Sequence, residues 1–357
     1  MPHSQRNRFM PVTPWWQSWF MGVAWLVTIA TGLLCAAWGC MALLEHAPAR
    51  HNIAQALALV WGFAWVVLFG CGALQQRMLP IWAGGLALML GLLAWWGTIE
   101  PQADREWAAD VAELVEIKSD KTAPNIVHLR NVRNFAWRSE TDFTPNWEER
   151  SYDLSQLNTV DVALSYWMGP AIAHTLVSFG FTDGQHVVFS IEIRKEQHEQ
   201  FDPLAGFFKH YEMALVAADE RDILAVRTNV RGEQVHLYRV NLPQDSMRSL
   251  FMAYARQANQ LAYVPRFYHT LTANCTTIVW QLARRIGQVL PTDWRLLASG
   301  YLPEYLRDSG ALASMKPLEL LRNEGHITTR AQSWQAPNTS SDAEASADFS
   351  RHIRAGM

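Results

Sequence analysis

The chain has 357 residues, half of them hydrophobic, with 17 tryptophans and a formal net charge of −3. This length is sufficient for a membrane section and one sizeable soluble domain. The near-neutral charge balance gives no argument for nucleic acid as a partner.

Three long apolar runs fill the first hundred residues, at 16–44, 53–74 and 79–98. Each approaches or exceeds the ~20 residues that a helix needs to cross a bilayer, and none contains an internal Asp, Glu, Lys or Arg. A signal peptide followed by core helices is the alternative, but the first run is too long for it and two more runs follow closely. We therefore expect three transmembrane helices, preceded by a cytoplasmic N-terminus at 1–15.

Basic residues set the expected orientation of these helices. Arg6 and Arg8 precede the first span and Arg77 lies between the second and third, whereas Arg50 is alone in the other loop. Loops rich in basic residues stay in the cytoplasm. Everything after the third span should then lie outside it, in the periplasm, which predicts a multi-pass protein of the bacterial inner membrane.

Hydrophobic periodicity predicts a mixed α+β soluble domain over 99–330, with an antiparallel sheet and helices. A helical segment at 105–116 joins it to the third span, and a polar loop at 137–153 separates the first two strands. Residues 331–357 are rich in Ser, Ala, Asp and Glu and predict a disordered tail. The expected strands are 125–134, 160–167, 212–218, 223–228 and 235–240, and the expected helices are 204–211, 244–261, one opening at 275, and 291–307.

The segment 174–194 predicts a β-hairpin whose register follows from parity. The bulky side chains of both halves are all odd-numbered, so paired positions must sum to an even number. A three-residue loop at 182–184, with Gly184 left-handed, satisfies this condition. It places His174 opposite Glu192, where a carboxylate can orient an imidazole. An ordinary polar pair on a solvated face is the alternative.

Cys275 is the one cysteine outside the apolar third of the chain, since Cys35, Cys40 and Cys71 lie in the expected spans. Asn274 is a favoured N-cap, and the positive end of the following helix favours a thiolate. An unpaired thiol in an oxidising compartment is either a liability or a reactive group. The alternative is a small apolar residue that fills the core.

A cysteine, a histidine and an acidic partner form the usual set of groups for acyl transfer through a thioester. Cys275 would attack the acyl carbonyl, His174 would move the proton, and backbone amides at the helix start would stabilise the oxyanion. Asn274, Ser190 and Tyr166 are candidate supporting residues. We expect no cofactor and no metal, because the sequence has no phosphate-binding glycine loop and no zinc spacing.

Seven blocks of sequence in order carry a family resemblance: RNVRNFAWRSETDF, LSYWMGPAIAHTLVSFGF, SIEIRKE, LAGFFKHYE, ADERDILAVRTNVRG, LTANCTT and DWRLLASGYLPEY. Over about 120–330, the chain resembles the Lnb N-terminal periplasmic domain family. The resemblance implies a circularly permuted papain-like or NlpC-like fold in which histidine precedes cysteine. It carries His174 and Cys275 over as catalytic, with Glu192 or a neighbour on its strand as third member. Tyr268-His269 departs from the expected Tyr-Asn, which puts a peripheral contact in doubt.

The resemblance implies transfer of a fatty acyl chain from phospholipid to an amine such as a lipoprotein N-terminus. The expected partners are thus a phospholipid donor, a lipoprotein or other amine acceptor, and the membrane. Two alternatives stay open. One is a periplasmic cysteine peptidase or amidase that acts on peptidoglycan or peptides, and the other is a non-catalytic, membrane-anchored envelope module.

Overall fold

A computed structural model describes residues 15–46, 51–337 and 341–357. The chain divides into two compact units, Met1–Glu100 and Pro101–Met357. Residues 1–14 and the loop with Arg50, on which the expected orientation partly depends, lie outside the described residues.

The first unit consists of three long helices, α1 (Trp15–His46), α2 (His51–Gln75) and α3 (Leu79–Gly97). All three are long and apolar enough to cross a membrane, as predicted. Trp61 and Trp65 of α2 are buried among them, and the Trp61 indole donates to the Ala36 carbonyl over 3.0 Å. Such a bond satisfies a polar group that lipid cannot satisfy.

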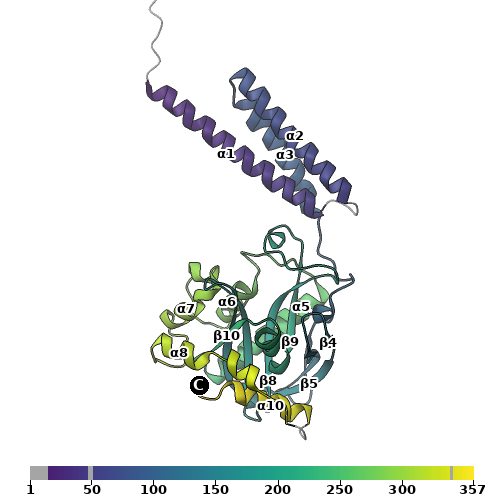
Figure 1. Cartoon of the computed structure of the whole chain (residues 1–357), viewed down its shortest axis with the longest axis vertical. Coiled ribbons are helices and arrows are strands. Elements are labelled where there is room, and N and C mark those ends of the chain that lie inside the picture. Colours follow the sequence, from purple (N-terminus) through teal and green to yellow (C-terminus); the bar gives the residue numbers. More distant parts are fainter. Residues whose placement is uncertain (1–14, 47–50, 338–340) are drawn as a thin grey trace, which may run out of the picture. The chain divides into compact units, whose positions relative to one another are not determined.

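The second unit is built on an eight-stranded sheet with the order β1-β2-β9-β8-β7-β6-β10, where β5 also pairs with β2 (Figure 1). All neighbours are antiparallel except β2 and β9. A two-stranded sheet, β3-β4, lies apart. The strands are β1 (Glu116–Ser119), β2 (Ile126–Arg133), β3 (Ala136–Trp137), β4 (Phe143–Thr144), β5 (Trp147–Asp153), β6 (Leu157–Met168), β7 (Ile172–Phe181), β8 (His186–Arg194), β9 (Glu212–Ala218) and β10 (Gln234–Arg239).

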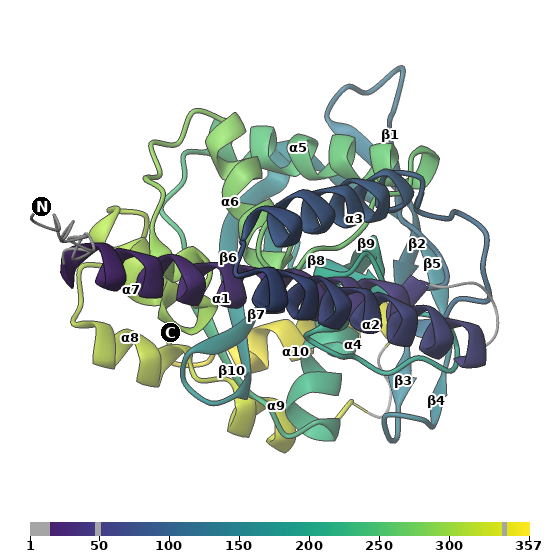
Figure 2. The same ribbon diagram turned by 90° about the horizontal axis from the view of Figure 1, so that it is seen from above.

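Helices cover both faces of this sheet (Figure 2). On one face α5 and α6 pack on the odd-numbered residues of the β7–β8 hairpin, including Phe179 and Phe189. On the other face α4, α9 and α10 cover even-numbered residues such as Leu176 and Val188. The α-helices are α4 (Glu220–Ala225), α5 (Gln244–Tyr263), α6 (Cys275–Arg285), α7 (Leu302–Asp308), α8 (Leu318–Gly325), α9 (Thr328–Ser333) and α10 (Asp342–Ile353). The predicted α+β class is confirmed.

The helix predicted at 105–116 does not form. Only a short 3-10 turn, Ala109–Val111, is present, and β1 begins at Glu116. Arg194 explains the difference, because its guanidinium binds the carbonyls of Val111 and Ala112 and stacks 4.4 Å from the Trp107 ring centroid. These tertiary contacts replace the hydrogen bonds of a helix.

Three other predicted segments also differ from the structure. The polar loop at 137–153 contains β4 and β5, since β5 pairs along β2. The strand at 223–228 is helical, in α4 and a π-turn that follows it (Val226–Val230). The helices at 204–211 and 291–307 are reduced to 3-10 turns and α7.

The tail predicted to be disordered from 331 onward is instead ordered over the residues that the structure describes there. The helix α10 begins with a capping box formed by Ser341 and Glu344. Phe349 and Ile353 are fully buried against the sheet. The soluble unit therefore extends well past residue 330.

Candidate active site

The β7–β8 hairpin has the register that parity predicts. Gly180 pairs with His186 and Leu176 with Ser190, so that paired positions sum to an even number. The loop is Thr182 to Gly184, and Gly184 has a φ of +89°. The alternation therefore predicts both the loop length and the face on which each side chain lies.

The two strands separate beyond this ladder, and the candidate site lies where they separate. The pairing of β7 with β8 stops at Leu176–Ser190, while β7 continues along β6 as far as Ile172. The next hydrogen-bonded partner of Thr175 would have been Ile191. Instead, the Thr175 amide donates to the Cys275 sulfur. The start of α6 thus lies beside the point where the two strands separate.

Asn274 places Cys275 at the start of α6, as predicted. Its side chain accepts from the amides of Thr276 and Thr277, and the Thr277 hydroxyl accepts from the Asn274 amide, which completes a capping box. The Thr175 and Thr276 hydroxyls are 2.8 Å apart and join α6 to β7. Cys275 is 9% exposed, so the thiol is nearly enclosed.

The structure brings His174, Ser190 and Glu192 together. The His174 Nε2 lies 2.7 Å from the Ser190 hydroxyl and 3.2 Å from a Glu192 oxygen. The Ser190 hydroxyl also donates to Glu192 over 2.6 Å. With Nε2 occupied in this way, Nδ1 is the nitrogen available for the hydrogen bond that the His174 ring shares with Cys275. The pair lies on a largely buried face, not the solvated one of the alternative.

Arg227 is a fourth member of this group that sequence reasoning missed. Its guanidinium contacts Glu192 over 2.9 Å and Glu233 over 3.4 Å, and Ser165 binds Glu233 in turn. The side chain of Arg227 is only 6% exposed. The strand predicted at 223–228 includes Arg227. The N-cap residue Asp219 and the acidic residues that follow it form a pattern that is instead typical of a helix start.

Charge and burial together tune the ionisation of the site. Burial opposes a charged imidazole, but the charge of Glu192 outweighs it and raises the pKa of His174 to about 9. Burial also opposes a thiolate, yet the charge and hydrogen bond of His174 lower the pKa of Cys275. Burial would raise the pKa of Glu192, but His174 and Arg227 hold it well below its usual range. Each of the two groups thus favours the charged form of the other.

Fewer backbone amides near the thiol are available to stabilise an oxyanion than the sequence predicts. Asn274 occupies two of the first amides of α6, and within the described residues the amide of Cys275 has no hydrogen-bond partner. The Tyr254 hydroxyl is fully buried without a hydrogen-bond partner, and burial together with the Cys275 charge raises the pKa of Tyr254 and of Tyr268. These groups are the candidate donors to an oxyanion.

Two of the remaining sequence candidates are peripheral. The Tyr166 hydroxyl donates to the Gly300 carbonyl over 2.8 Å, and burial raises the pKa of Tyr166 to about 12. On β6 the neighbour of His174 is Ser165, whereas Tyr166 pairs with Ala173. His269, at the departure from the family pattern, accepts from Thr272 within its own turn.

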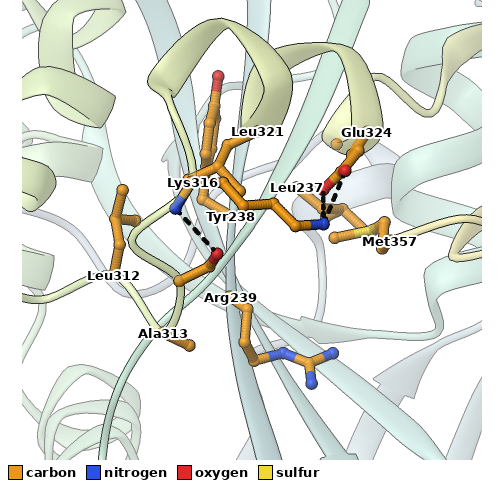
Figure 3. A pocket seen from close by; sticks show the side chains of 11 residues that line it. Leu237, Tyr238, Arg239, Leu312, Ala313, Lys316, Leu321, Glu324 and Met357 are labelled. Atoms are coloured by element: carbon orange, nitrogen blue, oxygen red, sulfur yellow. Dashed lines mark hydrogen bonds and ion pairs between the residues drawn. The ribbon is translucent and has the colours of Figure 1, made fainter.

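No cluster of metal-ligating side chains occurs in the described ranges. A cavity of about 210 Å³ lies beside β10 (Figure 3). It is lined by Leu237, Tyr238 and Met357, and it is bordered by the ion pair of Lys316 with Glu324 at 2.7 Å. None of the site residues lines it.

Comparison with known families identifies the central part of the soluble unit. Residues 143–300 match the family model of the Lnb N-terminal periplasmic domain. This part of the chain is therefore similar to the Lnb N-terminal periplasmic domain. No curated protein and no solved structure matches the chain. The relation to a papain-like or NlpC-like fold therefore stays a prediction.

The Lnb domain match spans His174, Ser190, Glu192, Arg227 and Cys275, so the whole group lies inside the family segment. The three apolar helices precede it. Together they describe a membrane-anchored module with its C-terminal domain in the periplasm.

Proposed function

We propose that this protein is a cysteine-dependent acyltransferase of the bacterial inner membrane that moves a fatty acyl chain from phospholipid to an amine. The observation that supports this proposal best is the chain of contacts from the Cys275 thiol through His174 to Glu192. Such a chain activates a thiol and orients its base. The family resemblance implies that the amine acceptor is the N-terminus of a lipoprotein.

The proposed reaction has two steps. In the first, the Cys275 sulfur attacks the ester carbonyl, a C–S bond forms, and the ester C–O bond breaks. The imidazolium of His174 gives its proton to the leaving alkoxide, which departs as lysophospholipid. In the second, the amine attacks the thioester, a C–N bond forms, the C–S bond breaks, and His174 takes the proton of the amine. The Cys275 amide is a candidate backbone donor for both oxyanions.

The test uses the full chain reconstituted in vesicles with a phospholipid that carries a labelled acyl chain. We expect labelled acyl on the Cys275 peptide by mass spectrometry, released by hydroxylamine and absent in Cys275→Ala. Addition of an amine acceptor should move the label to it. Cys71→Ala is the matched control, because that thiol lies in an apolar helix.

Each alternative predicts a different outcome of this experiment. Release of free fatty acid or cleavage of a peptide, without transfer to an amine, would indicate a hydrolase that uses the same residues. Full activity of Cys275→Ala in a lipoprotein mass assay would contradict both enzyme functions and leave a non-catalytic envelope module.

A further inference from the structure

Large apolar side chains lie exposed on four segments around the candidate site. Trp294 is 62% exposed, Leu204 is 59% exposed and Trp167 is 42% exposed. The six residues Trp167, Met168, Phe201, Leu204, Leu271 and Trp294 are called the apolar rim below.

The four segments belong to the catalytic end of the sheet. The turn with Trp167 precedes His174, and the segment with Leu204 follows β8, which carries Glu192. The loop with Leu271 leads directly into Cys275. The opposite end of β7 carries the hairpin loop at 182–184, so the rim is confined to one end of the molecule's central hairpin.

The rim is continuous, because contacts join its segments in pairs. The rings of Trp167 and Phe201 are 5.5 Å apart between centroids. The Thr270 hydroxyl donates to the Pro203 carbonyl over 3.1 Å, which joins the segment of Leu204 to that of Leu271. The amide of Gly300 donates to the Ala171 carbonyl over 2.9 Å, which joins the segment after Trp294 to the turn after Trp167.

The chain enters the soluble unit at this same end. The Gln102 amide donates over 2.8 Å to Glu212, which begins β9 and pairs with Arg194 at the end of β8. Gln102 is the fifth residue after Gly97, the end of α3. Five residues of extended chain span at most about 18 Å. The covalent link therefore keeps this end of the domain within reach of the bilayer surface.

We propose that the apolar rim is a membrane-docking surface, with the phospholipid headgroup and acyl boundary as its partner. Tryptophan and bulky aliphatic side chains favour this interface. The four segments contain both acidic and basic residues without a basic run, so contact by apolar insertion should persist at high salt. Docking would bring the ester of a phospholipid to the site where Cys275 meets His174. This role rests on the proposed function, whereas the docking surface itself is argued independently of it.

The test is photo-crosslinking in the full chain, reconstituted in vesicles of phosphatidylethanolamine and phosphatidylglycerol. The photoreactive residue p-benzoylphenylalanine is placed singly at positions 167, 204 and 294. Position 315 is the matched apolar control, since Met315 is 94% exposed outside the rim, and position 183 samples the far hairpin loop. We expect about tenfold more phospholipid adduct at the rim positions than at either control, unchanged at high salt.

A second variant keeps the proposal testable if labelling alters the fold. Leu204→Glu combined with Trp294→Glu should lower the adduct at position 167 about tenfold without changing the unfolding temperature, because both side chains are exposed. Equal yields at rim and control positions, or adducts to protein in place of lipid, would overturn the proposal. All measurements are made in Cys275→Ala, so a failure of acyl transfer and a failure of docking give separate results.

Discussion

Replacement of Glu192 by Gln tests the electrostatic basis of the site most directly. The change removes a charge 3.2 Å from the His174 Nε2 and keeps the shape of the side chain. The rise of the His174 pKa from 6.5 to about 9 corresponds to about 3 kcal/mol in favour of the imidazolium. Without Glu192, burial and Arg227 both oppose the charged ring, so the imidazole should become neutral at pH 7.

The assay is alkylation of Cys275 by iodoacetamide as a function of pH, followed on its own peptide by mass spectrometry. In the native chain the thiolate forms at lower pH than in an ordinary thiol, because the imidazolium lowers the pKa of Cys275. In Glu192→Gln the profile should move toward that of an ordinary thiol, of which only a few per cent is ionised at pH 7. The rate at pH 7 should then fall about tenfold or more.

A matched control exists in the same unit, where His210 and Glu199 form a second pair at 3.2 Å. Glu199→Gln should leave the alkylation profile of Cys275 unchanged. The same reasoning predicts how stability depends on pH. Because the folded pKa of His174 is raised, its contribution is complete below pH 6.5 and is lost as pH rises through about 9. An identical profile in Glu192→Gln and in the native chain would refute the proposed role of the carboxylate.

Three further substitutions probe positioning and stability. Ser190→Ala removes the hydroxyl that bridges the imidazole and Glu192, and it should lower the rate of thioester formation about tenfold with KM unchanged; a changed KM alone would contradict this role. Arg227→Met leaves Glu192 buried without its cation and should cost about 3–5 kcal/mol of unfolding free energy in a denaturant titration, so an unaltered midpoint would exclude the pair as structural. Phe349→Ala opens a cavity under α10 and should lower the free energy of unfolding by about 3–5 kcal/mol. Arg351→Ala, on the exposed side of that helix, should change it by less than about 0.5 kcal/mol. Equal effects of the two substitutions would show that α10 is not part of the core.

Strict alternation made the hairpin predictable. A one-residue shift in register would have placed Phe179 and Phe189 on opposite faces of the hairpin, so the pattern permits one loop length and one pairing. The N-cap at Asn274 was equally clear, because its residue type acts locally. In both places the deciding signal lies within the segment itself.

Other parts depend on partners distant in sequence. Arg194 binds the backbone near Val111 from more than eighty residues away, and no local pattern reports that contact. The helix of Arg227 is rich in β-branched residues, whose composition favours a strand, and its burial against the sheet outweighs that preference. The separation of β7 from β8 at Thr175 occurs where α6 contacts β7, and strand periodicity cannot predict that contact.

The C-terminal helix was missed for a different reason. Its overall composition is polar, which favoured disorder, but Ala345, Phe349 and Ile353 recur at four-residue intervals and mark one apolar side. Composition averaged over the segment concealed that periodicity. The four-residue spacing of these apolar side chains was the signal in the sequence that indicates a helix.

The position of α10 also constrains the order of events during biosynthesis. One face of the sheet, with Leu176 and Val188, is closed by residues as late as Ile353. Arg354 extends this closure, with contacts of 2.6 Å to Glu220 and 3.0 Å to Asp161. The periplasmic domain therefore cannot complete its core while residue 353 is still on the cytoplasmic side. Until translocation has passed that point, the part of this face that α10 covers stays exposed.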